Sequence, residues 1–249
     1  MAGHSHWAGI KHKKAAIDNK RGKVWSKLSK AIIVAAKTGG GDPETNIRLR
    51  TAIADAKMAS MPKDNITRAI KKGTGELEGG DVHEITYEGY GPSGVAVICD
   101  ILTDNRNRTA PEIRKLFEKH GGKLGSTNCV AWNFERKGLF LVSLENIDEE
   151  NLMEIAMEAG AEDMQQTEEH MELTCDPDIY TDVGDALESA GITVDSKQVT
   201  RLAQNTITLS VDEARPVLDL MEALDDYDDV QNVSANFELS AEAIAEFSG

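Results

Sequence analysis

Between residues 20 and 37, apolar and basic positions alternate with the period of an α-helix. At 100° per residue, one arc of about 100° holds five lysines, Lys20, Lys23, Lys27, Lys30 and Lys37. A separate arc of similar width is apolar and holds Val24, Trp25, Leu28, Ile32 and Ala35. Such a helix can pack one face against a core and present a ladder of ammonium groups on the other. The three glycines at 39–41 are expected to end it.

Two further helices are expected before residue 75. Asp42 is a favourable N-cap and Pro43 suits a first helical position, so the second helix is predicted to begin there. Its buried stripe is expected to consist of Ile47, Thr51, Ala54 and Met58. A third helix should cover residues 62–72, with three inward-facing residues, Ile66, Ala69 and Ile70. Its outward face should present four cations, Lys63, Arg68, Lys71 and Lys72. Residues 1–76 are thus predicted to form a small basic helical domain.

Beyond residue 80 the apolar positions alternate as in β-strands, with short helical patterns between them. Residues 138–205 predict the order βαββαβ, which is that of a complete ferredoxin-like unit. The flanking stretches, 80–136 and 206–240, each predict an incomplete set of strands and helices. We therefore expect these two stretches to form one discontinuous α/β domain with 138–205 inserted. Three consecutive domains are the alternative. The predicted fold class is α+β, a basic helical domain followed by two α/β domains.

Charge is distributed unevenly along the chain. Residues 1–72 hold 16 Lys+Arg and 5 Asp+Glu, a net of +11, although the whole chain carries −16. The remaining residues therefore net −27. An asymmetry of this size indicates a basic binding module joined to an acidic body. The alternative is a solvated, charge-rich helix surface. It accounts less well for an excess of basic residues that extends over several predicted helices.

Other features exclude whole classes of protein. No apolar run approaches the roughly 20 residues that a membrane-spanning helix needs, and the polar N-terminus lacks the apolar core of a signal peptide. The three cysteines, Cys99, Cys129 and Cys175, are far apart, which favours reduced thiols in a cytosolic protein. We therefore expect a cytoplasmic protein without a membrane partner.

No sequence motif predicts catalysis or a bound cofactor. The chain has no GxxxxGK[ST] phosphate loop, no GxGxxG opening a helix after a strand, no HExxH and no GxSxG. The acidic run DDYDD at 225–229 lacks the spacing of a calcium loop and follows a predicted helix, so we expect a solvated turn rather than a cation site. The expectation is a non-enzymatic protein with no cofactor, no metal and no small-molecule substrate.

Several segments carry family signatures, namely MAGHSHWAGIKHKKAAIDNKRGKVWSKL, GGGDPETNIRLRTAI, MPKDNITRAIKKGTG, YEGYGPSGVAV, LTDNRNRT, KHGGKLG and FERKG. They resemble the YebC/PmpR family of probable transcriptional regulators, to which the mitochondrial translational activator of cytochrome oxidase is related. The resemblance is specific from residue 1 to about 138 and looser beyond. It implies three domains, no cofactor and no catalytic residue. Two positions depart from the family pattern, His6, where Lys is expected, and Trp132.

The predicted function is that of a nucleic-acid-binding regulator of gene expression, a probable transcriptional regulatory protein that binds the phosphate backbone. Members of the family are described either as DNA-binding regulators or as ribosome-associated factors. Lys and Arg contact phosphates whatever the bases, so the basic helices cannot distinguish DNA from ribosomal RNA. The alternatives are therefore a translation factor that binds ribosomal RNA, and a protein-binding adaptor that docks on an acidic partner. No helix has base-reading residues at a suitable spacing, so we expect no sharp DNA sequence specificity.

The candidate nucleic-acid-binding residues lie in two places. Those in the predicted basic helical domain, residues 1–76, are His4, Lys11, Lys13, Lys14, Lys20, Arg21, Lys23, Lys27, Lys30, Arg48, Arg50, Lys71 and Lys72. Arg106 and Arg108 come just before a predicted helix N-terminus, where an anion would be favoured. An ordinary solvated turn explains these two arginines equally well.

Overall fold

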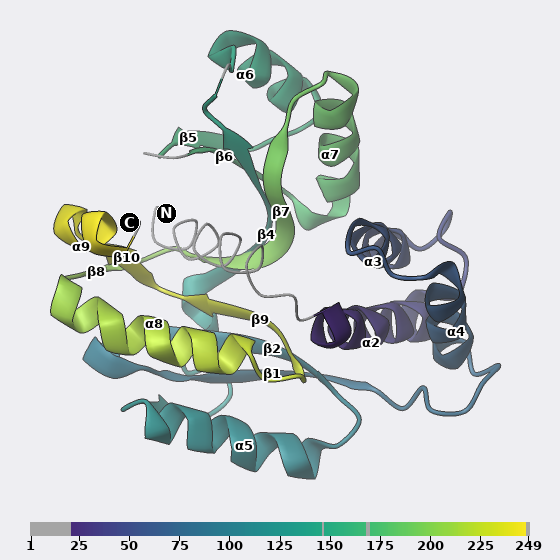
Figure 1. Cartoon of the computed structure of the whole chain (residues 1–249), viewed down its shortest axis with the longest axis horizontal. Helices are drawn as coiled ribbons and strands as arrows, with labels where there is room; N and C mark the ends of the chain where they lie inside the picture. Colours follow the sequence, from purple (N-terminus) through teal and green to yellow (C-terminus); the bar gives the residue numbers. More distant parts are fainter. Residues whose placement is uncertain (1–20, 146, 168–169, 248–249) are drawn as a thin grey trace. The chain divides into compact units, whose positions relative to one another are not determined.

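The computed structural model describes residues 21–145, 147–167 and 170–247 (Figure 1). Within this part of the chain there are two compact units, one of residues 21–131 and 212–233 and the other of 132–211 and 234–247. Helices and largely antiparallel sheets occur together, so the α+β class predicted from the sequence is confirmed. No helix of the described residues is long and apolar enough to cross a membrane.

The first unit begins with three helices, α2 (Arg21–Gly39), α3 (Ile47–Met58) and α4 (Lys63–Gly73). They share an apolar core that includes Ile32, Ile33, Ala35, Leu49, Ala52, Ala56, Ile66 and Ala69. The indole N–H of Trp25 donates to the carbonyl of Ala59 at 2.9 Å, which joins the start of α2 to the end of α3. The apolar arc predicted for α2 is therefore buried at its C-terminal half, whereas Val24 remains 45% exposed.

The start of α3 differs from the prediction. Asn46, not Asp42, is the N-cap, and its side-chain oxygen accepts from the Leu49 N–H at 3.0 Å. The Asn46 amide group also donates to the carbonyls of Ala35 and Gly40, at 2.9 and 2.8 Å. One side chain thus closes the end of α2 and opens α3. Asp42 instead accepts from the Glu44 N–H in the exposed turn before the helix.

The buried stripe predicted for α3 is also wrong. Ile47 and Met58 are 46% and 58% exposed, while the buried residues are Leu49, Ala52 and Ala56. Both sets have helical spacing, so the sequence pattern allows either to face inward. The second set is the one that packs in the shared core. The prediction for α4 is correct for Ile66 and Ala69, which are 7% and 3% exposed.

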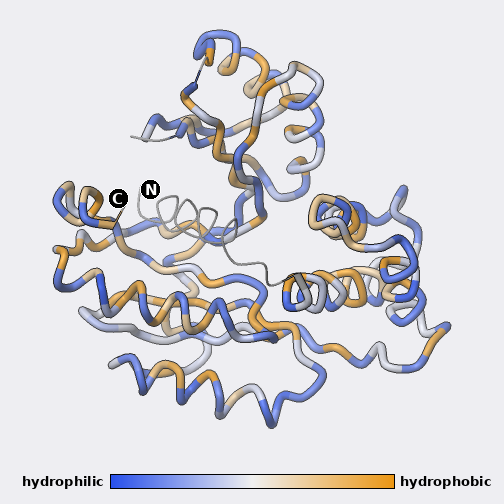
Figure 2. Tube along the Cα trace, viewed as in Figure 1, coloured by the Kyte–Doolittle hydropathy of each residue, from blue (hydrophilic) through white to orange (hydrophobic). Residues whose placement is uncertain are grey.

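The same unit contains a four-stranded sheet in the order β3-β1-β2-β9. Its strands are β1 (His83–Tyr90), β2 (Ala96–Thr103), β3 (Lys123–Leu124) and β9 (Val230–Ala235). The helices α5 (Arg106–Lys119) and α8 (Val211–Asp225) belong to it, and hydrophobic and hydrophilic stretches alternate along both (Figure 2). A Cβ atom at Gly89 of β1 would lie 2.8 Å from the Phe117 ring, so the glycine permits close approach of α5.

The second unit contains another four-stranded sheet, in the order β5-β6-β4-β7. Its strands are β4 (Phe134–Ser143), β5 (Asp163–Gln166), β6 (His170–Cys175) and β7 (Val194–Ala203). With α6 (Glu149–Glu158) and α7 (Tyr180–Ser189) they give the order βαββαβ that the pattern predicted. Their core includes the stacked rings of Phe140 and Tyr180, with centroids 5.0 Å apart. The unit ends with the parallel pair β8 (Ile207–Leu209) and β10 (Phe237–Leu239) and with α9 (Ala241–Phe247).

Three asparagines join the two ends of the segment that holds this second sheet. The Asn205 N–H donates to the side-chain oxygen of Asn133 at 2.9 Å, and the Asn133 amide donates to the Asn205 carbonyl at 2.9 Å. Asn236 also donates to that carbonyl, at 3.1 Å. Strand β9, which follows the segment in sequence, lies beside β2, which precedes it. This topology is the one that an insertion would produce, and the three domain boundaries themselves stay a prediction.

Candidate nucleic-acid interface

Several of the predicted contacts lie outside the described residues, namely His4, Lys11, Lys13, Lys14 and Lys20. Arg21 is the first residue of α2, and its side chain is likewise outside the described part. The remaining candidates fall into three groups. One lies along α2, one comprises Arg48 and Arg50 in α3 with Arg106 and Arg108 in α5, and one lies on α4.

Three lysines of α2 contact one short segment of the same unit. We call Lys23, Lys27 and Lys30 the lysine face, and residues 225–229 the acidic turn. The ammonium groups donate to carbonyl oxygens of that turn, Lys23 to Asp226 at 3.2 Å, Lys27 to Asp225 at 2.5 Å and Lys30 to Asp228 at 3.1 Å. The three groups lie on one side of α2, as the helical spacing predicted.

The position of the acidic turn explains this contact. It begins at the last residue of α8, where the final carbonyls of a helix lack intrahelical partners and have partial negative charge. The last turn of α8 has no basic residue of its own. The lysines of α2 therefore supply the cations that usually sit at a helix C-terminus.

Asp229 is the most buried member of the acidic turn, at 2% exposure. One of its oxygens accepts from Lys30 at 2.5 Å, and the other accepts from Thr103 at 3.0 Å, Thr109 at 2.6 Å and Arg108 at 2.9 Å. Burial alone would raise the pKa of this carboxyl, but the hydrogen bonds from Lys30, Thr109 and Arg108 lower the pKa to about 2. The expected solvated turn is therefore wrong for Asp229, whose four donors come from other parts of the fold.

The other arginines are also engaged within the protein. Arg48 forms a two-point ion pair with Glu84, at 2.7 and 3.0 Å. Arg50 donates to the carbonyls of Pro43 and Glu44 and so holds the turn before α3. Arg108 pairs with Asp104 as well as with Asp229, both at 2.9 Å.

The start of α5 is closed by Asn105, whose side chain accepts from the Arg108 N–H at 3.1 Å. An anion is therefore not needed to satisfy that N–H group. Arg106 is exposed at the first position of the helix.

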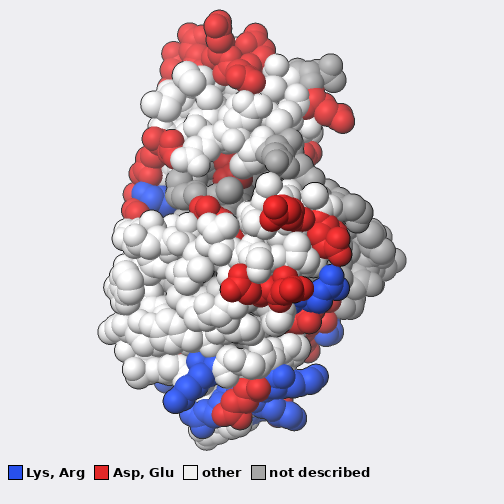
Figure 3. Space-filling view, turned by 90° about the vertical axis from the view of Figure 1, so that its left-hand side faces the viewer, with Lys and Arg blue, Asp and Glu red and all other residues white. Residues whose placement is uncertain are grey.

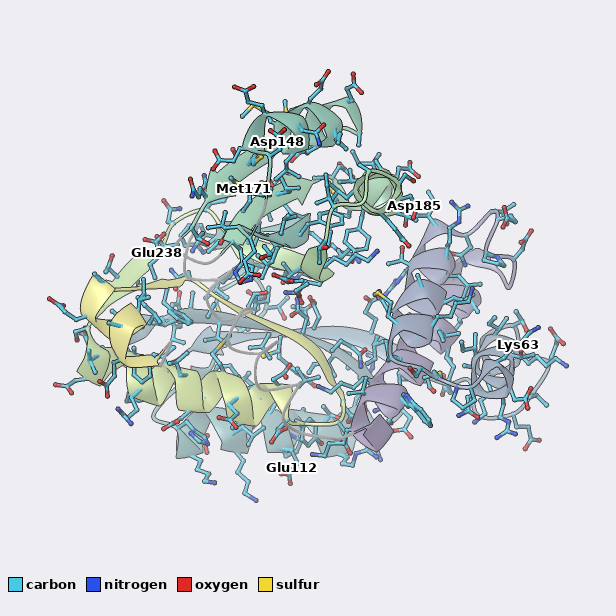
Figure 4. All side chains as sticks on the ribbon, turned by 45° about the horizontal axis from the view of Figure 1, so that its top comes forward. Lys63, Glu112, Asp148, Met171, Asp185 and Glu238 are labelled. Atoms are coloured by element: carbon cyan, nitrogen blue, oxygen red, sulfur yellow. The ribbon has the colours of Figure 1, made fainter. Side chains whose placement is uncertain are left out.

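Helix α4 presents cations that are not engaged in this way. Lys63, Arg68 and Lys71 are exposed, Lys72 is half-buried, and no ion pair joins any of them to a carboxylate of the described residues. At 100° per residue, the four lie within an arc of about 180°, opposite the buried Ile66 and Ala69. Figure 4 shows Lys63 at the outer side of this helix. Lys63 and Arg68 were absent from the candidate set, although their helical spacing predicted the outward direction.

Another group of cations lies on α5 and β3, and acidic side chains are interspersed with it at the bottom of Figure 3. Arg114, Lys115, Lys119 and Lys123 are exposed there. So are Glu112 and Glu118 of the same helix. The field at this surface is therefore mixed in sign, unlike that of α4, where Asp64 is the one acidic residue between residues 63 and 73.

The described residues include no group of three or more His, Cys, Asp or Glu side chains that could hold a metal ion. Cys99 and Cys175 are buried, and burial raises the pKa of both thiols, that of Cys175 to about 11. Burial and then the neighbouring Glu88 raise the pKa of the partly exposed Cys129. Thiols in this state are protonated at neutral pH and are weak nucleophiles.

Comparison with known proteins gives matches along almost the whole chain. Residues 5–76 match the domain described as the TACO1/YebC protein N-terminal domain, and residues 82–237 match the TACO1/YebC second and third domain. A probable transcriptional regulatory protein of Rhodopirellula baltica is 55% identical over 99% of this chain and 100% of its own length. One of Natranaerobius thermophilus is 56% identical over 96% of this chain and 97% of its own.

A solved structure agrees with these matches. The crystal structure of a conserved hypothetical protein, Aq1575, from Aquifex aeolicus superimposes with a TM-score of 0.84 at 50% sequence identity. The similarity covers 94% of this chain and 97% of that one. Together with the two domain matches, it shows that the chain belongs to the TACO1/YebC family.

Proposed function

We propose that this protein is a non-enzymatic regulator of gene expression that binds the phosphate backbone of nucleic acid through its basic helices. The observation that supports this most directly is a group of cations on α4 that no ion pair joins to a carboxylate of the described residues. We call this group the α4 basic face: Lys63, Arg68, Lys71 and Lys72. The names of the relatives, probable transcriptional regulatory proteins, support the same kind of role.

The dimensions of α4 suit a phosphate backbone. Its 11 residues extend over about 16 Å at 1.5 Å per residue. One strand of duplex DNA offers a phosphate about every 3.4 Å along its axis, so that length is comparable with four or five phosphates. The negative charge of the chain beyond residue 72 would repel phosphates, which leaves the helical region as the part that approaches them.

Low base specificity is part of the proposal. The exposed side of α4 offers Asn65 and Thr67 beside its cations, and this is little for reading base edges. Phosphate contacts position a protein without identifying the sequence. A structured ribosomal RNA is therefore as good a physiological target as DNA, and both are used as probes below.

The experiment compares two charge-matched variants of the full chain. The first replaces the α4 basic face by Gln, and the second replaces Arg114, Lys115, Lys119 and Lys123 by Gln. Each loses one Arg and three Lys, and Gln has a helix propensity close to theirs. Binding to a duplex DNA and to a ribosomal RNA fragment is titrated at several salt concentrations.

If all four α4 cations contact phosphates, the log–log salt slope should flatten by about 3.6 on duplex DNA or about 2.8 on single strands. The second variant should bind with nearly the wild-type slope. Equal losses in the two variants would mean that net charge alone sets binding, and no binding by the wild type would refute the proposal. The nucleic acid that binds more tightly distinguishes the transcriptional from the ribosomal role.

A further inference from the structure

The lysine face of α2 meets a set of oxygens that resembles what a nucleic acid would offer. Lys23, Lys27 and Lys30 lie over about 10 Å of helix, at 1.5 Å per residue. Each donates to an oxygen of the acidic turn, whose four aspartates add negative charge around the same ammonium groups. While the turn lies against these ammonium groups, it takes up space that a phosphate backbone would need, and its aspartates repel phosphates.

We propose that the acidic turn is a built-in competitor that occupies part of the lysine face until nucleic acid displaces it. The proposal rests on the function proposed above and adds a second, latent phosphate-binding face to the α4 basic face. While the turn is in place, it both occupies Lys23 and Lys27 and repels phosphates. When nucleic acid displaces it, these two lysines become additional phosphate contacts.

The three lysine–aspartate contacts become more buried from the N-terminal end of α2 onward. The most exposed contacts are the ones that nucleic acid can displace. At the N-terminal end, Lys23 and Asp228 are 47% and 61% exposed and their charged atoms are 3.9 Å apart. Lys27 and Asp225 are also 3.9 Å apart, at 19% and 21% exposure. At the far end, Lys30 and Asp229 are in contact at 2.5 Å, at 17% and 3% exposure. The Lys23–Asp228 pair is therefore the easiest to displace, the half-buried Lys27 contact is intermediate, and the Lys30–Asp229 pair is held most firmly.

Charge strength favours the exchange at the exposed end. The carboxylates of Asp228 and Asp225 lie beyond hydrogen-bond distance of Lys23 and Lys27, which hydrogen-bond to carbonyl oxygens instead. The exposed Lys23–Asp228 pair contributes little at this separation. A phosphate oxygen has a full negative charge and therefore attracts an ammonium group more strongly than a neutral carbonyl oxygen does. Nucleic acid can therefore replace the turn at Lys23 and Lys27, while the buried Lys30–Asp229 pair keeps α2 in place.

The test removes three carboxylates of the turn and leaves the Lys30–Asp229 pair. Full-length D225N/D226N/D228N is compared with E149Q/E150Q/E154Q, in which three exposed carboxylates of α6 are removed. Both variants gain three units of charge, and the acidic side chains of α6 are seen at the top of the view in Figure 3. Circular dichroism checks that each is folded. Affinity for a duplex DNA and for a ribosomal RNA fragment is measured against salt concentration.

The turn variant should bind more tightly than the α6 variant, because a turn without its carboxylates repels phosphates less and is displaced more easily; removing the two lysine contacts from it should flatten its salt slope by about 1.4 to 1.8. Adding K23Q/K27Q to the turn variant should abolish that gain. An equal gain in affinity in both triple variants, or a gain in affinity that remains after K23Q/K27Q is added, would overturn the proposal that the acidic turn competes with nucleic acid. So would an unchanged affinity of the turn variant when the wild type binds, and this outcome would leave the proposed function standing. A failure of every variant to bind would refute both.

Discussion

Replacing Asp229 by Asn tests whether this buried carboxylate joins α2 to the sheet. The wild-type side chain accepts from Lys30 on one oxygen and from Thr103, Thr109 and Arg108 on the other. Asn has almost the same size but only one acceptor oxygen. Either Lys30 or the group of three donors would therefore face an NH₂ group, which cannot accept.

The expected loss in the free energy of unfolding is roughly 2 to 4 kcal/mol. Hydrogen bonds to a charged group contribute about 1.5 to 3 kcal/mol each. The pKa of about 2, against an ordinary 3.8, corresponds to roughly 2 kcal/mol that favours the ionised form. The loss should stay below the sum of the four bonds, because Lys30 keeps the Asp228 carbonyl and Arg108 keeps Asp104.

The assay is urea unfolding at pH 7, followed by circular dichroism and tryptophan fluorescence, with D228N as the matched control. Asp228 is 61% exposed and its carboxylate is 3.9 Å from Lys23, so its replacement should cost no more than about 0.5 kcal/mol. The reasoning about Asp229 would be refuted if D229N and D228N differed from each other by less than about 1 kcal/mol.

Three further outcomes are expected. Folding lowers the pKa of Asp229 from 3.8 to about 2, so the stabilisation that its carboxylate provides is present above about pH 4 and is lost as the pH falls toward 2. The difference in the free energy of unfolding between the wild type and D229N, measured by urea titration, should therefore shrink across this pH range. Asn46→Ala should lower the free energy of unfolding by roughly 1 to 3 kcal/mol, because it removes a cap and two bonds to α2, whereas Asp42→Ala should cost less. With a thiol-reactive disulfide reagent at pH 8, Cys129 should react first, and Cys99 only as the protein unfolds, because Cys99 is fully buried.

The parts of the fold that depend on local periodicity could be predicted from the sequence. The helix over α2, the helix over α4 and the βαββαβ order of the second sheet all follow from patterns within a few turns or strands. The start of α3 was missed because Asp42 and Asn46 are both good N-cap residues. Asn46 can also reach the end of α2, which a linear pattern does not reveal.

The candidate site was predicted only in part, because its partners are far apart in sequence. A helical wheel shows that Lys23, Lys27 and Lys30 share a face, but not what meets that face. The partner of Lys27 lies 198 residues further along the chain. A run of aspartates looks solvated by composition, yet Asp229 is buried because Thr103 and Thr109 lie against it.

The charge asymmetry of the chain therefore has two consequences rather than one. Opposite charges that are separated along the sequence meet in space where α2 lies against the end of α8, and there they neutralise each other. Among the described residues, no acidic helix end pairs with the cations of α4, and this is why we propose α4 as the surface that meets a phosphate backbone. Salt should act differently on the two surfaces. It screens the exposed cations of α4 and the exposed Lys23–Asp228 pair, whereas the buried Lys30–Asp229 pair is screened much less. Rising salt should thus release nucleic acid from α4 while α2 stays joined to the acidic turn through Asp229.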